Sequence, residues 1–284
     1  MKLRKLNKSN DGVVGIVVAI LLVGLFISII AFVQTVYVPQ WMEKKEAEHM
    51  DQVANQFTQL KFAIDTLSVA AQKHSPISSS ITLGSQEMPF LSSNRAYGSL
   101  DILPNNCKIS IVDINGNSIP NLNLLGSIKY SSQNAYYLDR SYIYENGAVI
   151  LSQSNQDLMC INPSFEVIDM EDLSFNIVKI SGIGEKTSAS GYGTYPLQTK
   201  FLSSASDPVN HVKQINITTS YKNAWYNFFD DILSNSAINY KINDTVYDDG
   251  IIITFFPDDD DQQLPELFLK IVDIEIQISP GWVE

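Results

Sequence analysis

The pattern of hydrophobic and polar residues first marks a long apolar run near the N-terminus. Residues 13–33 (VVGIVVAILLVGLFISIIAFV) contain Ser28 as the single polar side chain. A helix needs about 20 apolar residues to cross the hydrocarbon core of a bilayer. The apolar region of a cleavable secretory signal is shorter, about 7–15 residues, and a soluble helix of this length carries a polar stripe. The run therefore predicts a transmembrane helix, to which we assign residues 13–36.

The residues that flank the run predict its orientation. Four basic residues lie within residues 1–12, whereas residues 43–48 (EKKEAE) are mixed and net negative. Basic residues favour the cytoplasmic side of a membrane. We therefore expect a cytoplasmic N-terminal leader and an extracellular C-terminal part. Tyr37 and Trp41 follow the run, where amphipathic rings favour the headgroup region.

Helical periodicity continues through residues 37–75, which we interpret as a helical stalk. Apolar residues recur at alternating spacings of three and four, at Met50, Val53, Phe57, Leu60, Ile64, Leu67 and Ala71. This spacing forms an a/d seam of three heptads, which must be buried. Two arrangements satisfy it: the seam pairs with copies of itself, or it packs against the sheet of the outer domain.

Residues 76–284 show the signals of strands and tight turns. Asn115-Gly116 and Asn146-Gly147 each separate two apolar stretches and predict hairpins with type I′ turns, and Asp249-Gly250 predicts another turn. In the last apolar stretch, 268–278, the alternation shifts by one place at Val272, which predicts a β-bulge.

One amphipathic helix interrupts this β region. Its apolar stripe has the spacing i, i+3, i+4, i+7, i+8 and consists of Trp225, Phe228, Phe229, Ile232 and Leu233. The predicted fold class is α+β: a long N-terminal helix followed by a mostly antiparallel β domain, of β-sandwich type, with one short amphipathic helix.

Charge then excludes one class of partner. The chain of 284 residues carries 19 basic and 31 acidic side chains, for a formal net charge of −12. A nucleic-acid-binding protein needs a basic surface to neutralise phosphate. We therefore expect no nucleic-acid partner, and membrane lipid as the partner of the apolar run.

Candidate modification sites are few. Cys107 and Cys160 leave two alternatives open, one disulfide in an oxidising compartment or two buried free thiols. Two N-glycosylation sequons of the outer part begin at Asn216 and Asn243, whereas Asn7-Lys8-Ser9 lies in the leader that we expect on the cytoplasmic side.

No motif for catalysis, cofactor binding or metal binding stands out. The histidines at positions 49, 74 and 211 are scattered, and the glycine-bearing stretch 182–188 lacks the spacing of a phosphate-binding loop. The four consecutive residues Asp258–Asp261 cannot all face one ion, so a solvated loop is favoured over a calcium site. We predict that the protein is not an enzyme and has no cofactor.

Two groups of residues resemble known families. Asn10-Asp11-Gly12 directly before the apolar run resembles the class III signal of archaeal type IV pilins and pilin-like proteins. The resemblance implies a cut between Gly12 and Val13 by a prepilin peptidase, and a helix that continues into a β-rich head. The early acidic residue of many bacterial pilins is missing. Several further stretches are similar to a widespread group of archaeal pilin-like surface proteins, namely residues 38–41 (VPQW), 46–50 (EAEHM), 142–150 (YIYENGAVI) and 162–165 (NPSF).

These resemblances imply a non-catalytic function at the cell surface. The first expectation is a pilin-like structural or minor subunit of an archaeal filament, which self-associates or packs with other pilin-like subunits through its N-terminal helix. The alternative is a permanently anchored extracellular domain for adhesion or envelope organisation. The mature N-terminus distinguishes them: Val13 favours the first, and a retained Met1 favours the second.

Overall fold

The computed structural model describes most of the chain outside its termini and some loops. The described residues are 11–73, 75–85, 96–119, 122, 125–154, 156–169, 171–182, 186–244, 250–257 and 264–278. Three features of the sequence lie outside them: residues 1–10 with the basic side chains of the leader, His74 and the aspartate run 258–261.

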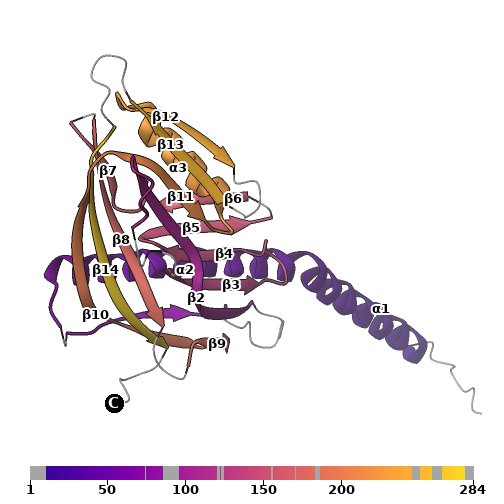
Figure 1. Cartoon of the computed structure of the whole chain (residues 1–284). Helices are drawn as coiled ribbons and strands as arrows, with labels where there is room; N and C mark the ends of the chain where they lie inside the picture. The colour runs from indigo at the N-terminus through magenta and orange to yellow at the C-terminus, as the bar shows by residue number, and fades with distance from the viewer. Residues whose placement is uncertain are drawn as a thin grey trace, which may run out of the picture.

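One long helix forms the N-terminal part of the molecule (Figure 1). α1 (Asp11–Phe32) continues through a π-helical turn, η1 (Val33–Tyr37), into α2 (Val38–Ala70). Pro39 lies in the first turn of α2 and has no backbone N–H for an α-helical hydrogen bond. Proline and π turns are frequent causes of helix bends. Figure 1 shows such a bend here, where α1 departs from the direction of α2.

The strands follow α2. In chain order they are β1 (Ile77–Thr82), β2 (Tyr97–Asp113), β3 (Leu125–Gln133), β4 (Ser141–Glu145), β5 (Ala148–Gln153), β6 (Gln156–Ile161), β7 (Phe165–Ile168), β8 (Asp172–Gly182), β9 (Ser188–Gly191), β10 (Thr194–Val209), β11 (Val212–Thr218), β12 (Asn239–Asp244), β13 (Gly250–Phe256) and β14 (Leu267–Ile278). The helix α3 (Lys222–Ser234) lies between β11 and β12. It confirms the amphipathic helix expected from the spacing of Trp225 and its neighbours.

These strands build two sheets. The five-stranded sheet has the order β1-β10-β14-β8-β7, and the nine-stranded sheet has the order β12-β13-β11-β2-β3-β4-β5-β6, with β9 paired to β2. All pairs are antiparallel except β8 with β14, which are parallel. The fold is therefore α+β with a mostly antiparallel β domain, as the sequence predicts.

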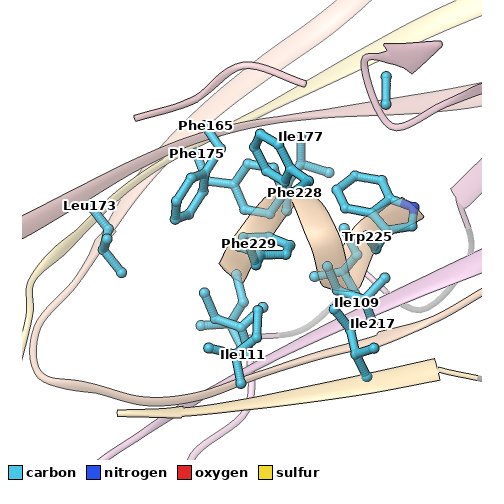
Figure 2. Close-up of a cluster of buried hydrophobic side chains, with 14 of the residues drawn as sticks. Ile109, Ile111, Phe165, Leu173, Phe175, Ile177, Ile217, Trp225, Phe228 and Phe229 are labelled. Carbon is cyan, nitrogen blue, oxygen red and sulfur yellow. The ribbon is translucent and has the colours of Figure 1, made fainter. Parts of the chain in front are cut away.

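Two hydrophobic cores lie on opposite faces of strands β3 to β5. We call the first the α2 core, because the apolar residues of α2 form its centre: Met50, Val53, Phe57, Leu60, Ile64 and Leu67, all at most 2% exposed. The second, the α3 core, is rich in aromatic rings around α3 (Figure 2). In it Phe229 lies 5.0 Å from Phe165 and 5.9 Å from Trp225, measured between ring centroids.

The α2 core decides between the two arrangements of the helical seam. Every seam residue from Met50 to Leu67 packs inside this chain, against side chains of both sheets. The structure therefore confirms packing on the sheet and leaves no seam for a coiled coil of copies. Residues 42–67 of the expected stalk lie within the β domain, which Figure 1 shows folded around α2.

Burial on both faces explains the composition of the β4–β5 hairpin. Tyr142, Tyr144 and Val149 point into the α2 core, whereas Ile143 and Ile150 point into the α3 core. Strands buried on both faces are nearly continuous in apolar residues, as is the stretch 142–150. A polar residue inside such a stretch must find its partners within the protein.

The hairpin predictions are confirmed in part. Asn146 and Gly147 have φ angles of +48° and +80°, as a type I′ turn requires. Gly116 has a φ of +84° but Asn115 is not among the residues with positive φ, so the tight turn is present and its predicted type is wrong. Gly250 lies within β13, opposite Thr218, and not in a turn. A Cβ there would lie 2.3 Å from the carbonyl oxygen of Ile217, so close strand packing requires this glycine.

The bulge predicted at Val272 is wrong. β14 pairs with β8 without a register shift from Leu267 to Ile276, and the irregularity in its other pairing lies on β10, between Phe201 and Ser203. The alternation changes because β14 serves both cores. Its odd-numbered residues enter the α3 core up to Ile271, and its even-numbered residues enter the α2 core from Val272 onward.

Candidate functional site

The first candidate site is the apolar surface of α1, at the N-terminal end of the molecule. Its large side chains from Val14 to Phe32 are all between 49% and 67% exposed, on every side of the helix. The helix is long and apolar enough to cross a membrane, with a mean hydropathy of 3.3 over its best window. Lipid is the environment in which such an all-round apolar helix is stable. The structure is consistent with a single-pass membrane protein.

Glu46 fastens α2 to the β domain close to the membrane end. Its carboxylate is fully buried and accepts three backbone N–H groups from the β3–β4 loop: those of Ala135 at 3.0 Å, Tyr136 at 2.8 Å and Tyr137 at 2.7 Å. Hydrogen bonds to a charged group are among the strongest in proteins. They offset the cost of burying the carboxylate and fix the loop on the helix.

One helical turn further, His49 makes a second polar link. Its Nε2 lies 3.2 Å from the carbonyl oxygen of Leu83 and 3.1 Å from the hydroxyl of Tyr130, which itself donates to Leu83 at 2.9 Å. A carbonyl only accepts, so the contact places a proton on Nε2. Burial lowers the pKa of His49 and favours the neutral ring.

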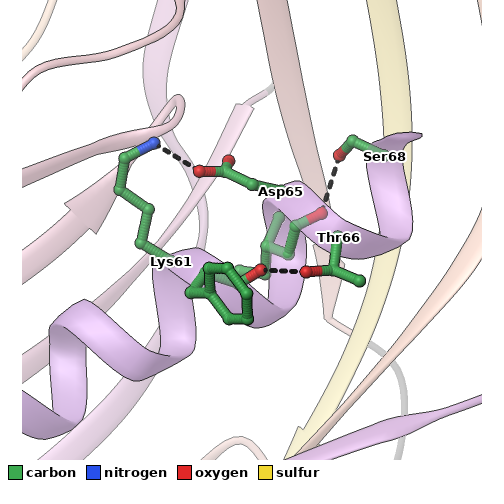
Figure 3. A network of polar contacts seen from close by, with 6 residues as sticks. Lys61, Asp65, Thr66 and Ser68 are labelled. Carbon is green, nitrogen blue, oxygen red and sulfur yellow. Dashed lines mark hydrogen bonds and ion pairs between the residues drawn. The ribbon is translucent and has the colours of Figure 1, made fainter. Parts of the chain in front are cut away.

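Several other polar residues of α2 are satisfied within the helix. Figure 3 shows the ion pair between Lys61 and Asp65, 2.8 Å long, and the hydroxyl groups of Thr66 and Ser68. These hydroxyls donate to carbonyl oxygens one turn earlier in the helix, at 2.7 and 2.8 Å. Gln56 also contacts the β domain, where its Oε1 accepts the backbone N–H of Thr82 at 2.9 Å, but Glu46 and His49 differ from it in being buried.

A third buried polar group lies at the end of β4, next to the hairpin turn that leads into β5. The Oε1 atom of Glu145 accepts the hydroxyl of Thr219 at 2.7 Å and the indole N–H of Trp225 at 2.9 Å. The thiol of Cys107 lies against the same carboxyl group. Burial raises the pKa of Glu145 to about 7, and the contacts with Thr219, Trp225 and Cys107 oppose this shift. Glu145 therefore connects the central sheet with the first turn of α3.

The structure does not support a disulfide. Cys107 is a buried free thiol in the α3 core, and Cys160 is an exposed free thiol on β6. Strands β2 and β6 are separated by three strands, which corresponds to about 19 Å along the sheet. A disulfide requires Cα atoms within about 7 Å. The expectation of one disulfide is therefore wrong in this fold, and only one of the two free thiols is buried.

The two sequons differ in their setting. Asn216 lies in β11, an interior strand that pairs with both β2 and β13. Asn243 is exposed on β12, the edge strand of the sheet, and the Thr245 of its sequon lies outside the described residues. Asn243 is therefore the more accessible candidate for glycosylation.

Among the described residues, the histidines and carboxylates do not converge on a common site. His49 is committed to the α2 contact, and His211 contacts the carbonyl oxygen of Leu264 at 3.4 Å. Within the part of the chain that the structure describes, no group of three histidine, cysteine, aspartate or glutamate side chains is placed to hold a metal ion.

Sequence reasoning missed the roles of three buried polar residues. Glu46, His49 and Glu145 all lie in stretches that carry the resemblance to pilin-like surface proteins, but their partners are distant in sequence. For Glu145 a local signal exists, because it is an isolated acidic residue within an apolar stretch. For Glu46, beside other charged residues, no such signal exists.

Comparison with known proteins returns a match to one family. Searches among curated proteins and among solved structures find no match. Residues 12–272 match the model of a family of unknown function, DUF7289. The matched range begins at Gly12 and includes α2, α3 and all three buried polar residues. On this match, the chain belongs to the DUF7289 family.

Proposed function

We propose that the protein is a pilin-like structural or minor subunit of an archaeal cell-surface filament, with no catalytic role. The observation that carries the proposal is the division of the N-terminal helix. The apolar seam of α2 is buried within the chain's own head, whereas the apolar surface of α1 protrudes and is exposed on every side. Such a surface is stable in lipid or packed against the same helix of other subunits.

In this arrangement α1 attaches the chain to the membrane, and the β domain is the part that is displayed. α1 lies in the bilayer with its N-terminus in the cytoplasm, and the acidic β domain lies outside. Glu46 and His49 hold α2 in the domain by hydrogen bonds to the β3–β4 loop and to Leu83. A force applied to α1 would therefore be transmitted to the β domain through these buried contacts and not through a flexible linker.

The mature N-terminus tests the filament proposal. We expect a chain purified from its native membrane to begin at Val13. Gly12→Leu should block cutting, leave the unprocessed chain in the membrane and abolish fibres that contain it. Gly15→Leu is the matched control for the cut itself, because it is also a glycine-to-leucine change in α1 and leaves the cut site unchanged, so its mature N-terminus should remain Val13. A retained Met1, with no fibres in wild-type cells, would contradict the proposal.

A second candidate is a permanently anchored extracellular domain for adhesion or envelope organisation. The observation that favours it is the composition of residues 13–33, which contain no charged residue that could set the register between neighbouring subunits. Under this candidate Met1 is retained, and Gly12→Leu changes neither membrane association nor surface display. Protease added to intact cells should remove the β domain under both candidates.

A further inference from the structure

The carboxyl group of Glu145 is satisfied on one side only. Oε1 accepts two hydrogen bonds, from Thr219 and Trp225, whereas Oε2 is buried and has no hydrogen-bond partner. The Oγ atom of Ser127 is likewise buried and has none. A buried polar atom without a partner costs free energy, so two such atoms near one another call for a common explanation.

The sheet register places these two atoms on the same side of the sheet. Ser127 on β3 and Glu145 on β4 are directly paired, and both residues are 0% exposed. The side chains of directly paired residues in antiparallel strands share one face, with Cβ atoms about 4.5–5.5 Å apart. The two atoms form no direct hydrogen bond in the structure. A hydroxyl and a carboxyl group at this separation can be joined through one water molecule.

The surroundings of Glu145 supply no compensating positive charge. The titratable groups that face it are the Cys107 thiol from β2, Asp157 from β6 and the Tyr221 hydroxyl from the segment before α3. None of the ion pairs formed between described residues involves Glu145. An unpaired buried carboxylate is costly, whereas a protonated carboxyl group is neutral and gains one O–H donor.

We propose that Glu145 is a proton-binding site in the core, that its Oε2–H donates to a water molecule that bridges to Ser127, and that this neutral carboxyl group fastens α3 to the central sheet. The proton and the bridging water together then satisfy both orphan atoms. The donors from Thr219 and Trp225 complete the link, because Trp225 belongs to the first turn of α3. The proposal does not rest on the filament proposal.

The link should weaken as the pH rises. In the unfolded chain a glutamate has a pKa near 4.5, and in the fold the pKa of Glu145 is about 7. The folded state therefore binds the proton more tightly. The stabilisation is fully present below about pH 4.5 and is lost as the pH rises through about 7. Loss of the proton leaves a charge in the α3 core and favours opening of α3.

The proposal can be tested in detergent micelles on a chain that keeps Glu145 and its partners. Trp225 is labelled with 5-fluorotryptophan after Trp41→Phe and Trp282→Phe remove the other two tryptophans. We expect the fluorine resonance of Trp225 to titrate with a midpoint near pH 7, and hydrogen exchange in α3 to accelerate above it. A resonance unchanged between pH 5 and 9 would overturn the proposal.

Glu145→Gln provides the second measurement. Glutamine is nearly the same shape, stays neutral and keeps a donor for the bridging water. We expect this variant to unfold at the same denaturant concentration as wild type at pH 5, and at a higher one at pH 8.5. Glu166→Gln on β7, outside both cores, is the control and should follow wild type at both values. A variant that is as pH-dependent as wild type would refute the assignment to Glu145; if it does not fold, the fluorine titration decides.

Discussion

The carboxylate of Glu46 accepts the backbone N–H of Tyr137 at 2.7 Å, across 91 residues of sequence. This contact connects the helix, near the point where it leaves the membrane, with the loop between two central strands. The direction of the head relative to α1 is therefore set by a buried side chain and by the bend at η1. It does not depend on a linker.

Replacement of Glu46 tests this contact. Glu46→Ala leaves three backbone N–H groups of the β3–β4 loop without their acceptor. We expect a loss of about 3–5 kcal/mol in the free energy of unfolding, as for other buried charge-assisted contacts, measured by denaturant titration in micelles. Glu48→Ala, an exposed position on the same helix, should change it by less than about 1 kcal/mol. Equal effects of the two changes would show that the contact is not structural.

The buried seam makes a prediction about Phe57. This side chain is 0% exposed in the α2 core, 6.0 Å from the ring of Tyr142. Phe57→Asp removes a ring and buries a charge, at a cost of several kcal/mol, so we expect the head to be unfolded and degraded by protease. Phe62→Asp is the matched control on the same helix, because Phe62 is 73% exposed. A protease-resistant Phe57→Asp head would contradict the described packing of α2.

The cysteines should behave as two unlike free thiols. Burial raises the pKa of Cys107 well above its ordinary value, which makes this thiol unreactive in the folded state. Under non-reducing conditions we expect an alkylating reagent to label Cys160 alone, and both residues after unfolding, as counted by mass spectrometry. Cys160→Ala should abolish labelling of the folded protein. A chain that resists labelling until it is reduced would restore the disulfide.

His49 should make the α2 contact sensitive to acid. Its pKa is lowered from 6.5 by burial, so the unfolded chain takes up a proton on His49 at a higher pH than the folded chain does. Stability from this residue is therefore lost as the pH falls below about 6.5, opposite in sign to the effect of Glu145. We expect His49→Gln to reduce the loss of unfolding free energy between pH 6.5 and 5. An unchanged loss would assign the acid sensitivity to other groups.

The helices and most turns were predictable because their signals are local. The apolar run, the seam from Met50 to Leu67 and the stripe around Trp225 each report a helical period within a short window. Asn146-Gly147 specifies its turn because both residues take up positive φ. That the apolar side of α2 is buried was also predictable. Which surface covers it was not.

Features that depend on distant pairing were not predictable. The shift of alternation at Val272 is visible in the sequence, but its cause is a second core on the other face of β14. Glu145 and Thr219 are 74 residues apart, and their hydrogen bond exists only after the end of β4 and the segment between β11 and α3 have come together. Gly250 resembles a turn residue, although the close approach of Ile217 is what requires it. Tertiary contacts decide such positions.

The position of β14 has a consequence for folding during synthesis. This strand lies between β10 and β8 and contributes to both cores, and Lys270 on it donates to the carbonyl oxygen of Ser68 at the end of α2, 202 residues earlier. The long N-terminal helix is made first, whereas a shared wall of both cores is made more than 200 residues later. A chain whose synthesis has not reached β14 would have both cores open at once, with the seam of α2 uncovered. Closure of the head thus reports that synthesis has passed β14, and shorter chains remain open to proteases.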